Sequence, residues 1–249
     1  MKKLEDIPFF RILQKIPYEN VSKILRLKMP PEERPRDSKT LLSDFRNLHF
    51  GGTCFSLVNL LIRSLEIEGI RAYPVKAEIH RRSFPHFFAI VEYRNKHYLV
   101  DPGYLINQPV EIIPAGKNLL RSGAIDFTVK ALEDERYQLQ TQSNGTLTTR
   151  YTFRIEPLDH ADFMHYWIRS FDYINAIVAS RFIDDKFIYI NDDYVQIRSK
   201  GNIEKYQQRE KAYEYLNLYF DLDETMIRAA EALLKKYLHN KSGEKEKHS

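Results

Sequence analysis

The residue most able to act as a nucleophile is Cys54, the single cysteine among 249 residues. It follows the only double glycine, Gly51-Gly52, and stands where a helix reaching Glu68 is predicted to begin. Unpaired N–H groups and partial positive charge at a helix N-terminus favour thiolate, the reactive form of cysteine. The glycines would let a substrate approach closely, and the Cys54 N–H would point at a developing oxyanion. The alternative is that Cys54 is a small buried apolar residue.

A predicted β-hairpin supplies two further polar residues. His86 opens one strand and Asp101 closes its partner, with a turn at residues 94–96. A two-residue loop can use either the first or the last pair of that turn, and both registers place His86 and Asp101 on the same sheet face. The first register makes them diagonal neighbours, close enough for their side chains to meet. A bulge or an odd-length loop would break this parity.

Together these residue types predict a thiolate–imidazole–carboxylate triad. An Asp hydrogen-bonded to one imidazole nitrogen fixes the tautomer and leaves the other nitrogen for a thiol. That arrangement is the one nucleophilic catalysis requires. Taken singly, His86 after Pro85 is typical of a surface residue, and Asp101 at a strand end is typical of a turn cap. Their common sheet face, in a chain with one cysteine, favours the triad.

The pattern of apolar residues changes from helical to extended at about residue 71. The helix from Cys54 is apolar around most of its circumference, so it should be buried on most sides, and Gly69 should end it. Short strands separated by turn residues then predict a small barrel or a curled sheet. Strands are expected at 72–79, 87–93, 97–100, 110–113, 127–132, 137–141, 148–155, 187–190 and 194–197, and helices at 158–169 and 222–238.

Composition excludes several classes of protein. Hydrophobic residues make up 43% and charged residues 29%, which is typical of a globular chain. The net charge is +4, and the Lys and Arg residues are interspersed with Asp and Glu rather than clustered in one segment. We therefore expect no nucleic-acid partner. The longest nearly apolar run, 55–62, is far too short to span a membrane, so no membrane partner is expected. One cysteine fits a reducing compartment, and the acidic residues near the N-terminus argue against a signal peptide, so we predict a cytoplasmic protein.

Several motifs, in order along the chain, match a known family. Residues 49–55, His-Phe-Gly-Gly-Thr-Cys-Phe, resemble the Arg-Gly-Gly-x-Cys-Phe/x-Glu signature of arylamine N-acetyltransferases. Residues 98–104, Tyr-Leu-Val-Asp-Pro-Gly-Tyr, are similar to that family's Val-Asp-x-Gly-Phe segment, and Ile-Pro-Tyr-Glu-Asn at 16–20 is similar to its Ile-Pro-Phe-Glu-Asn. Pro85-His86 before an apolar strand looks like the family's triad histidine. Further likenesses at 180–182 and 216–220 extend the resemblance over nearly the whole chain.

The resemblance implies an α+β fold with a cysteine-proteinase-like core. This fold has an N-terminal helical domain, a central β-barrel and a C-terminal α/β lid. We expect the helical domain with the nucleophile at 1–70, the barrel with His86 and Asp101 at 71–156, and the lid at 157–240. A polar tail at 241–249 is expected to be disordered.

The resemblance also implies a ping-pong reaction. Cys54 would take an acetyl or other acyl group from a coenzyme A thioester and pass it to an arylamine or hydrazine. By position, Tyr104 matches the aromatic wall of the family's acceptor pocket, and Phe87 is expected nearby. No metal and no tightly bound cofactor are implied, and acetyl-CoA or another acyl-CoA serves as co-substrate. The complete set of expected site residues is Cys54, His86 and Asp101 for catalysis, Phe87 and Tyr104 for substrate binding, and Gly51, Gly52 and Gly103 for structural support.

The sequence departs from the family pattern at three positions. Phe50 stands in place of the arginine before the glycines, and Ser56 in place of the glutamate after the cysteine. In the family these two charged residues support the active site, so the support here must differ. Leu105 stands where a glycine is expected, and a bulky residue there would block pantetheine entry or change the acyl donor.

Two rival functions fit the same residues. A transglutaminase-like amidase or peptidase would share the Cys–His–Asp order and the succession of helices and barrel, and it would hydrolyse rather than transfer. A catalytically silent relative would keep the fold as a binding protein. Phe50, Ser56 and Leu105 motivate this second rival.

Overall fold

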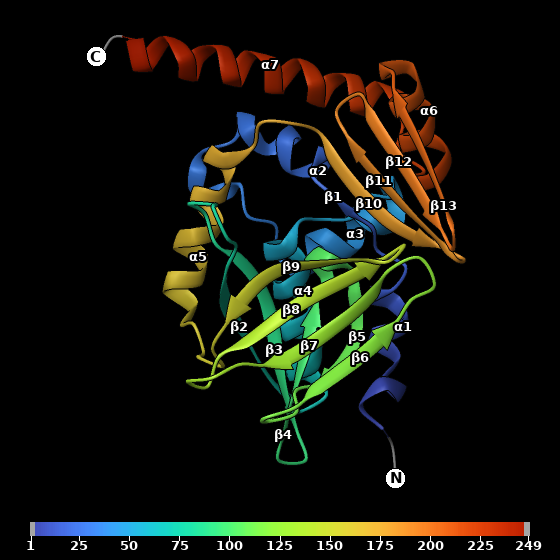
Figure 1. The fold of residues 1–249 in the computed structure, drawn as a ribbon. Helices are drawn as coiled ribbons and strands as arrows, with labels where there is room; N and C mark the ends of the chain where they lie inside the picture. Colours follow the sequence, from blue (N-terminus) through green and yellow to red (C-terminus); the bar gives the residue numbers. More distant parts are fainter. Residues whose placement is uncertain (1–2, 247–249) are drawn as a thin grey trace.

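Two antiparallel sheets with helices packed on them make up the fold, as the computed structural model of the chain shows for residues 3–246, with side chains to residue 243 (Figure 1). The larger sheet has eight strands in the order β5-β4-β3-β2-β9-β8-β7-β6. Its end strands β5 and β6 contact each other without pairing, so the sheet curls into a nearly closed barrel. The strands are β2 (Arg71–Glu78), β3 (His86–Tyr93), β4 (Lys96–Asp101), β5 (Ile106–Glu111), β6 (Lys117–Arg121), β7 (Asp126–Ala131), β8 (Tyr137–Ser143) and β9 (Thr146–Phe153).

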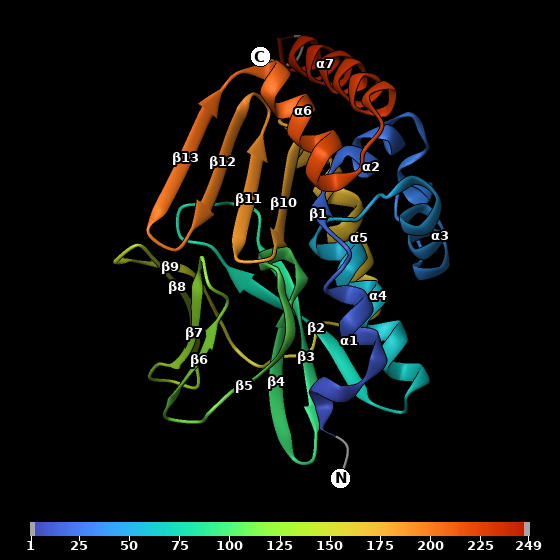
Figure 2. The same ribbon diagram turned by 90° about the vertical axis from the view of Figure 1, so that its right-hand side faces the viewer.

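The smaller sheet forms the core of the lid. Its five strands run in the order β1-β10-β11-β12-β13, and they are β1 (Tyr18–Glu19), β10 (Val178–Ile183), β11 (Lys186–Asn191), β12 (Tyr194–Ser199) and β13 (Asn202–Gln207). Helix α6 (Arg209–Phe220) packs on this sheet, and α7 (Glu224–Glu246) runs across the top of the molecule against α2 (Val21–Ile24) (Figure 2). Strand β1 comes from the N-terminal region, so residues 18–19 are joined to the lid sheet through their pairing with β10.

Helices from the N-terminal region cover one side of the barrel. The central one, α4 (Cys54–Ile67), lies across β2 and β3 and contacts α1 (Pro8–Leu13) and α3 (Ser38–Leu48). Between barrel and lid, α5 packs aromatic side chains against α4. The remaining helices are α1 (Pro8–Leu13), α2 (Val21–Ile24), α3 (Ser38–Leu48), α4 (Cys54–Ile67) and α5 (His160–Arg169), with short 3-10 turns at Leu4–Asp6, Leu25–Lys28, Pro31–Glu33, Pro102–Tyr104 and Ser170–Tyr173.

Strand β3 is buried on both faces and divides the core in two. Phe87 and Val91 belong to the cluster around α4, whereas Phe88 and Ile90 belong to the cluster inside the barrel. Because side chains alternate along a strand, His86 shares the barrel face with Phe88. This alternation decides which residues of β3 can reach a site at the barrel mouth.

The hairpin register is the first of the two considered from the sequence. Tyr93 pairs with Lys96, and Arg94 and Asn95 form the turn with φ values of 53° and 58°. This register places Asp101 beyond the pair Ala89–Val100, diagonal to His86.

Other elements did not follow from the sequence. Helix α3 buries only Leu41, although its apolar residues Leu41, Leu42, Phe45 and Leu48 recur at helical spacing, and strand β13 buries no residue. Strands β6 and β10 and helix α6 were also not predicted. The tail predicted as disordered from 241 is wrong over its first part, because α7 continues to Glu246, and the rest of that prediction, 247–249, lies outside the described residues. No helix among the described residues has the length and apolar character needed to cross a membrane.

Two glycines in different backbone conformations give a direct test of these local assignments. Gly145 has a φ of 79° in the β8–β9 turn, and no atom lies within 4 Å of a Cβ built there. Gly145→Ala should therefore lower the free energy of unfolding by about 1 kcal/mol through backbone strain alone. Gly243→Ala, in α7 and equally unobstructed, should be neutral or slightly stabilising. Chemical denaturation of both variants measures the difference, and equal losses would contradict it.

Candidate active site

Cys54 is the first residue of α4, as the sequence predicted. The preceding Thr53 is extended and its side chain forms no capping hydrogen bond, so no side chain competes for the first N–H groups of the helix. The thiol is half-buried and lines a cavity. Partial positive charge from the helix terminus therefore acts on a sulfur that a small molecule can reach.

His86 and Asp101 meet at the mouth of the barrel. His86 Nε2 lies 2.9 Å from both carboxylate oxygens of Asp101 and donates its proton to them. The imidazole also interacts with the Cys54 side chain. Because Nε2 is hydrogen-bonded to the carboxylate, Nδ1 is the ring nitrogen left to contact the sulfur. The structure thus brings together the three residues that the sequence singled out from 54, 86 and 101.

The Asp101 carboxylate is wholly buried and receives several hydrogen bonds besides the one from His86. The backbone N–H groups of Gly103 and Tyr104 donate to Oδ1 at 3.0 and 3.2 Å. The hydroxyl of Tyr151, on β9, donates to Oδ2 at 2.7 Å. A buried charge is stable only when it is paired and hydrogen-bonded in this way. The ordered carboxylate in turn fixes the orientation of the His86 ring.

The pKa of His86 reflects this environment. Burial alone would lower the pKa, but the Asp101 carboxylate and the Cys54 side chain outweigh burial and raise it to about 10. The imidazole is therefore protonated at neutral pH, which suits a thiolate partner. Burial and the nearby Asp101 raise the pKa of Tyr151 well above its ordinary value, so its hydroxyl remains a donor.

Glycine is required at the three positions expected to support the site because neighbouring atoms approach the backbone closely there. None of the three has a positive φ. A Cβ on Gly103 would lie 2.7 Å from His86 Cε1 and 3.1 Å from Cys54 Cβ. A Cβ on Gly51 would collide with the carbonyl of Pro17, and one on Gly52 with the hydroxyl of Ser56. Their role is therefore to make room between elements that converge on the triad.

Arg36 supports the loop that leads into Cys54, and the sequence did not single it out. Its Nη2 donates to the Gly51 carbonyl at 2.6 Å and to the Ser22 hydroxyl at 2.8 Å, while Nη1 pairs with Asp44 at 2.9 Å. The Arg36 side chain is 4% exposed. This guanidinium provides support where Phe50 and Ser56 replace the charged residues of the family pattern.

Local sequence carried little signal for Arg36 or Tyr151. Arg36 lies in a proline-rich loop that also contains Arg34, and Tyr151 is one of 16 tyrosines in the chain. The one available signal was indirect, since the missing arginine before Gly51 implied that another group must support the loop.

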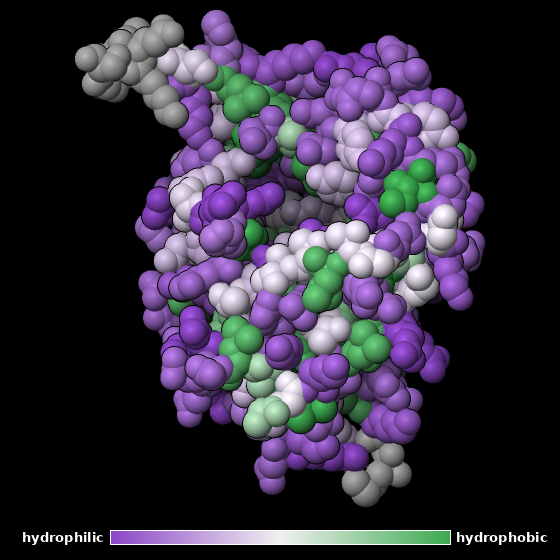
Figure 3. Space-filling view, in the orientation of Figure 1, coloured by the Kyte–Doolittle hydropathy of each residue, from purple (hydrophilic) through white to green (hydrophobic). Residues whose placement is uncertain are grey.

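Two cavities reach the triad from different sides. The larger, of about 650 Å³, is lined by Cys54, His86, Lys23 and the loop before β3. Burial lowers the pKa of Lys23 to about 8. The smaller, of about 430 Å³, lies between barrel and lid and is lined by His86 and Tyr104. In the space-filling view the surface is hollowed between the lid and the barrel (Figure 3).

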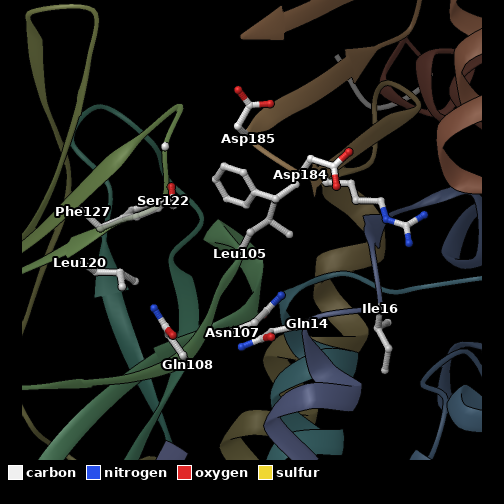
Figure 4. A pocket seen from close by; sticks show the side chains of 13 residues that line it. Gln14, Ile16, Leu105, Asn107, Gln108, Leu120, Ser122, Phe127, Asp184 and Asp185 are labelled. Carbon is white, nitrogen blue, oxygen red and sulfur yellow. The ribbon is translucent and has the colours of Figure 1, made fainter. Parts of the chain in front are cut away.

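Leu105 and Phe127 line a third cavity as well as the smaller one, so they form a wall between the two (Figure 4). This third cavity, of about 500 Å³, has amide side chains at its other end, including Gln14 and Asn107. The buried Asn107 Oδ1 has no hydrogen-bond partner among the described residues. The bulk of Leu105 therefore stands between this cavity and the triad.

The two residues expected to bind substrate lie in different places. The Tyr104 ring contacts the His86 ring edge-on at 5.1 Å and lines the smaller cavity. Phe87 instead packs on Phe55 of α4 at 4.6 Å and is wholly buried in that cluster. Strand alternation turns it away from His86, so the geometry does not support its predicted role in substrate binding. No group of three or more His, Cys, Asp or Glu side chains in the described chain could hold a metal ion.

Replacing Arg36 tests the support it gives the loop. Arg36→Met keeps the apolar length but leaves the Gly51 carbonyl and Asp44 without their donor, and we expect it to cost about 2–4 kcal/mol of unfolding free energy. Arg63→Met removes an exposed ion pair with Glu66 on α4 and should cost less than about 0.5 kcal/mol. Denaturation monitored by circular dichroism compares the two, and similar small losses would refute the role of Arg36.

Comparison with known proteins places the chain in a family. A family model described as N-acetyltransferase matches residues 1–227. A comparison with the sequences of curated proteins gave no match.

Solved structures with the same fold agree with the family model. An arylamine N-acetyltransferase variant from Mycobacterium smegmatis superposes with a TM-score of 0.75 at 15% identity, over 94% of this chain and 92% of that one. The Mycobacterium marinum enzyme in complex with CoA gives 0.72 at 15% identity, over 91% and 90% of the chains. A Bacillus cereus enzyme described with a Cys-His-Glu triad gives 0.70 at 16% identity, over 89% and 92%. With the family model covering nearly all of its length, the chain belongs to the arylamine N-acetyltransferase family of enzymes.

Proposed function

We propose that this enzyme transfers an acetyl or other acyl group from a coenzyme A thioester to an arylamine or hydrazine through a thioester on Cys54. The observation that carries the proposal is the His86 imidazole, bonded through Nε2 to the buried Asp101 and in contact with the Cys54 thiol. In this proposal residues 1–70 carry the nucleophile, 71–156 carry His86 and Asp101, and 157–240 close the site as a lid.

The first half-reaction transfers the acyl group from the donor to the Cys54 sulfur. His86 holds the thiol proton as an imidazolium, and the Cys54 thiolate attacks the thioester carbonyl of the donor. Negative charge develops on the carbonyl oxygen, which the N–H groups at the start of α4 would stabilise. The attack forms the bond between the Cys54 sulfur and the carbonyl carbon. Collapse of the intermediate then restores the carbonyl and breaks the bond to the coenzyme A sulfur, which leaves with the proton from His86.

The second half-reaction transfers the acyl group from Cys54 to the acceptor. The acceptor amine attacks the acyl–Cys54 carbonyl, and His86 takes a proton from the amine nitrogen. The Cys54 thiolate then leaves, so the enzyme returns to its starting state with no net change of proton or charge. Asp101 stays ionised throughout and holds the imidazole in place.

Two similar structures support the choice of donor and mechanism. The M. marinum relative was solved with CoA, and the B. cereus relative is described with a Cys-His-Glu triad, in which a carboxylate occupies the third position as Asp101 would here. A reducing compartment such as the cytoplasm would keep the single cysteine as a free thiol.

Intact-mass spectrometry tests the acyl-enzyme directly. After incubation with acetyl-CoA and without an acceptor, the protein should gain the mass of one acetyl group, and Cys54→Ser should gain none. Adding an aromatic amine should remove the label and yield the acetylated amine. Exclusive hydrolysis of the loaded protein would favour the amidase rival, and full transfer activity in Cys54→Ser would refute the mechanism.

The pH dependence of thiol alkylation tests the ion pair. Because the pKa of His86 is raised to about 10, its positive charge is present at neutral pH and is lost only as pH rises through that value. We therefore expect the rate of iodoacetamide reaction at Cys54 to change little between about pH 6 and pH 9, whereas an ordinary thiol gains reactivity as it ionises near pH 8.5.

Variants identify the groups responsible. Asp101→Asn should lower the alkylation rate at neutral pH by about tenfold or more and restore an ordinary rise with pH. His86→Gln should do the same, which provides a second test if Asp101→Asn folds poorly. Glu92→Gln, farther along β3, should keep the wild-type profile. An ordinary thiol profile in the wild-type protein would favour the silent relative.

A further inference from the structure

Tyr18 carries a hydroxyl where the family pattern Ile-Pro-Phe-Glu-Asn has an unsubstituted phenyl ring. Its backbone is fixed on both sides. On one side it forms a parallel bridge with Gly52, closed by backbone hydrogen bonds of 3.1 and 3.2 Å. On the other side it pairs with Ser180 of β10. The backbone that carries this ring is therefore held beside the loop that leads into Cys54.

The Tyr18 side chain lies on the face of the lid sheet that looks onto the triad. Side chains at paired positions of neighbouring strands share one face of a sheet. Tyr18, Ser180 and Tyr189 are paired in this way across β1, β10 and β11, and all three line the smaller cavity. Tyr18 also lines the larger cavity, together with Cys54 and His86. It therefore stands where the two cavities that reach the triad adjoin.

The Tyr18 hydroxyl is open to a ligand. No group in the described part of the chain forms a hydrogen bond with it, and it is not among the enclosed polar atoms that lack a partner. The residue is half-buried. Because a buried tyrosine hydroxyl usually has a hydrogen-bond partner, a hydroxyl left free beside a thiol is available to a molecule bound there.

The electrostatics of Tyr18 make its hydroxyl a donor. Burial, and after it the charge of Cys54, raises the pKa of Tyr18 far above its ordinary value. The hydroxyl therefore keeps its proton at neutral pH and well above it. Cys54 also acts on Tyr18 more strongly than Asp101 does, which agrees with a hydroxyl close to the sulfur.

Acyl transfer at Cys54 calls for a second donor of this kind. The Cys54 N–H supplies one hydrogen bond to the oxyanion, and such an oxygen is usually held by two donors. Lys23 of the same cavity is engaged, since its Nζ donates to the carbonyl and the hydroxyl of Ser170 at 3.1 and 2.6 Å. Arg81 and Arg82 line the cavity but are exposed, and a donor surrounded by water contributes less.

On the basis of the proposed function, we propose that the Tyr18 hydroxyl is a catalytic donor that completes the oxyanion hole. As the Cys54 sulfur bonds to the carbonyl carbon, the π electrons of the carbonyl move onto its oxygen. Tyr18 would donate a hydrogen bond to that oxygen from the lid while the Cys54 N–H donates from α4. Tyr18 keeps its proton throughout, and the carbonyl is restored when the leaving group departs. Both half-reactions pass through such an intermediate, so the same hydroxyl would serve both.

Tyr18→Phe tests the proposal, because it removes one oxygen atom and restores the residue of the family pattern. We expect the variant to fold like the wild-type protein. Acylation of Cys54 by p-nitrophenyl acetate, measured by rapid mixing, should slow on the order of 10- to 100-fold with little change in the ester concentration at half-maximal rate. Tyr206→Phe makes the same change on β13, outside both cavities, and should leave the rate unchanged.

Iodoacetamide separates donation to the oxyanion from other roles of the hydroxyl. Its reaction displaces iodide from a saturated carbon and forms no oxyanion, but it requires the same thiolate. Tyr18→Phe should therefore be alkylated at Cys54 as fast as the wild-type protein at every pH. If alkylation slows as much as acylation, the hydroxyl acts on the thiol or on the position of β1, and the inference is wrong.

The outcomes distinguish this inference from the proposed function. If acetyl-CoA and the ester both acylate Cys54 and Tyr18→Phe reacts as fast as the wild-type protein with each, the acyltransferase proposal stands and the role of Tyr18 is refuted. If the ester alone acylates Cys54 and the variant slows that reaction without slowing alkylation, the role of Tyr18 stands and the proposed donor is wrong. If neither compound acylates Cys54, both proposals are refuted.

Discussion

The buried carboxylate of Asp101 is the constraint on which the arrangement of the site depends. A fully enclosed negative charge must be compensated by donors, and here they come from His86 on β3, the backbone after β4 and Tyr151 on β9. Each donor belongs to a different part of the barrel, so one charge fixes three elements relative to one another. The same hydrogen bonds orient the His86 imidazole. The stability of the barrel and the proposed chemistry therefore depend on the same contacts.

The sulfur is positioned by a second, separate network. Strand β1 lies between the loop that leads into Cys54 and the lid, with Tyr18 pairing Gly52 on one side and Ser180 on the other. Arg36 donates a hydrogen bond to the Gly51 carbonyl. The proposed base, His86, is thus fixed by the barrel, and the proposed nucleophile, Cys54, is fixed by the N-terminal segment. The packing of α4 on β2 and β3 joins the two networks.

Those features of the site that depend on periodicity were predictable, and those that depend on long-range contacts were not. Strand alternation placed Asp101 and His86 on one sheet face, and the first of the two possible turn registers, the one the structure adopts, makes them diagonal neighbours. The glycine pair followed by an apolar helix placed Cys54 at a helix start. Phe87 was misplaced for the same reason that His86 was placed well, since adjacent strand residues face opposite sides. Arg36 and Tyr151 act through contacts with residues 15 and 50 positions away, and no local pattern encodes such contacts.

Leu105 forms part of the wall at the boundary between barrel and lid. Leu105 adopts a φ of 60° where the family pattern has glycine, a conformation that costs a leucine about 1 kcal/mol or more. Its side chain is 8% exposed, and burial of this kind offsets such strain. The result is a wall that confines the smaller cavity, with Arg198 of the lid at its far side. Residues of the lid and of this wall can vary without disturbing the hydrogen bonds of Asp101, and we therefore expect acceptor selection to reside in them.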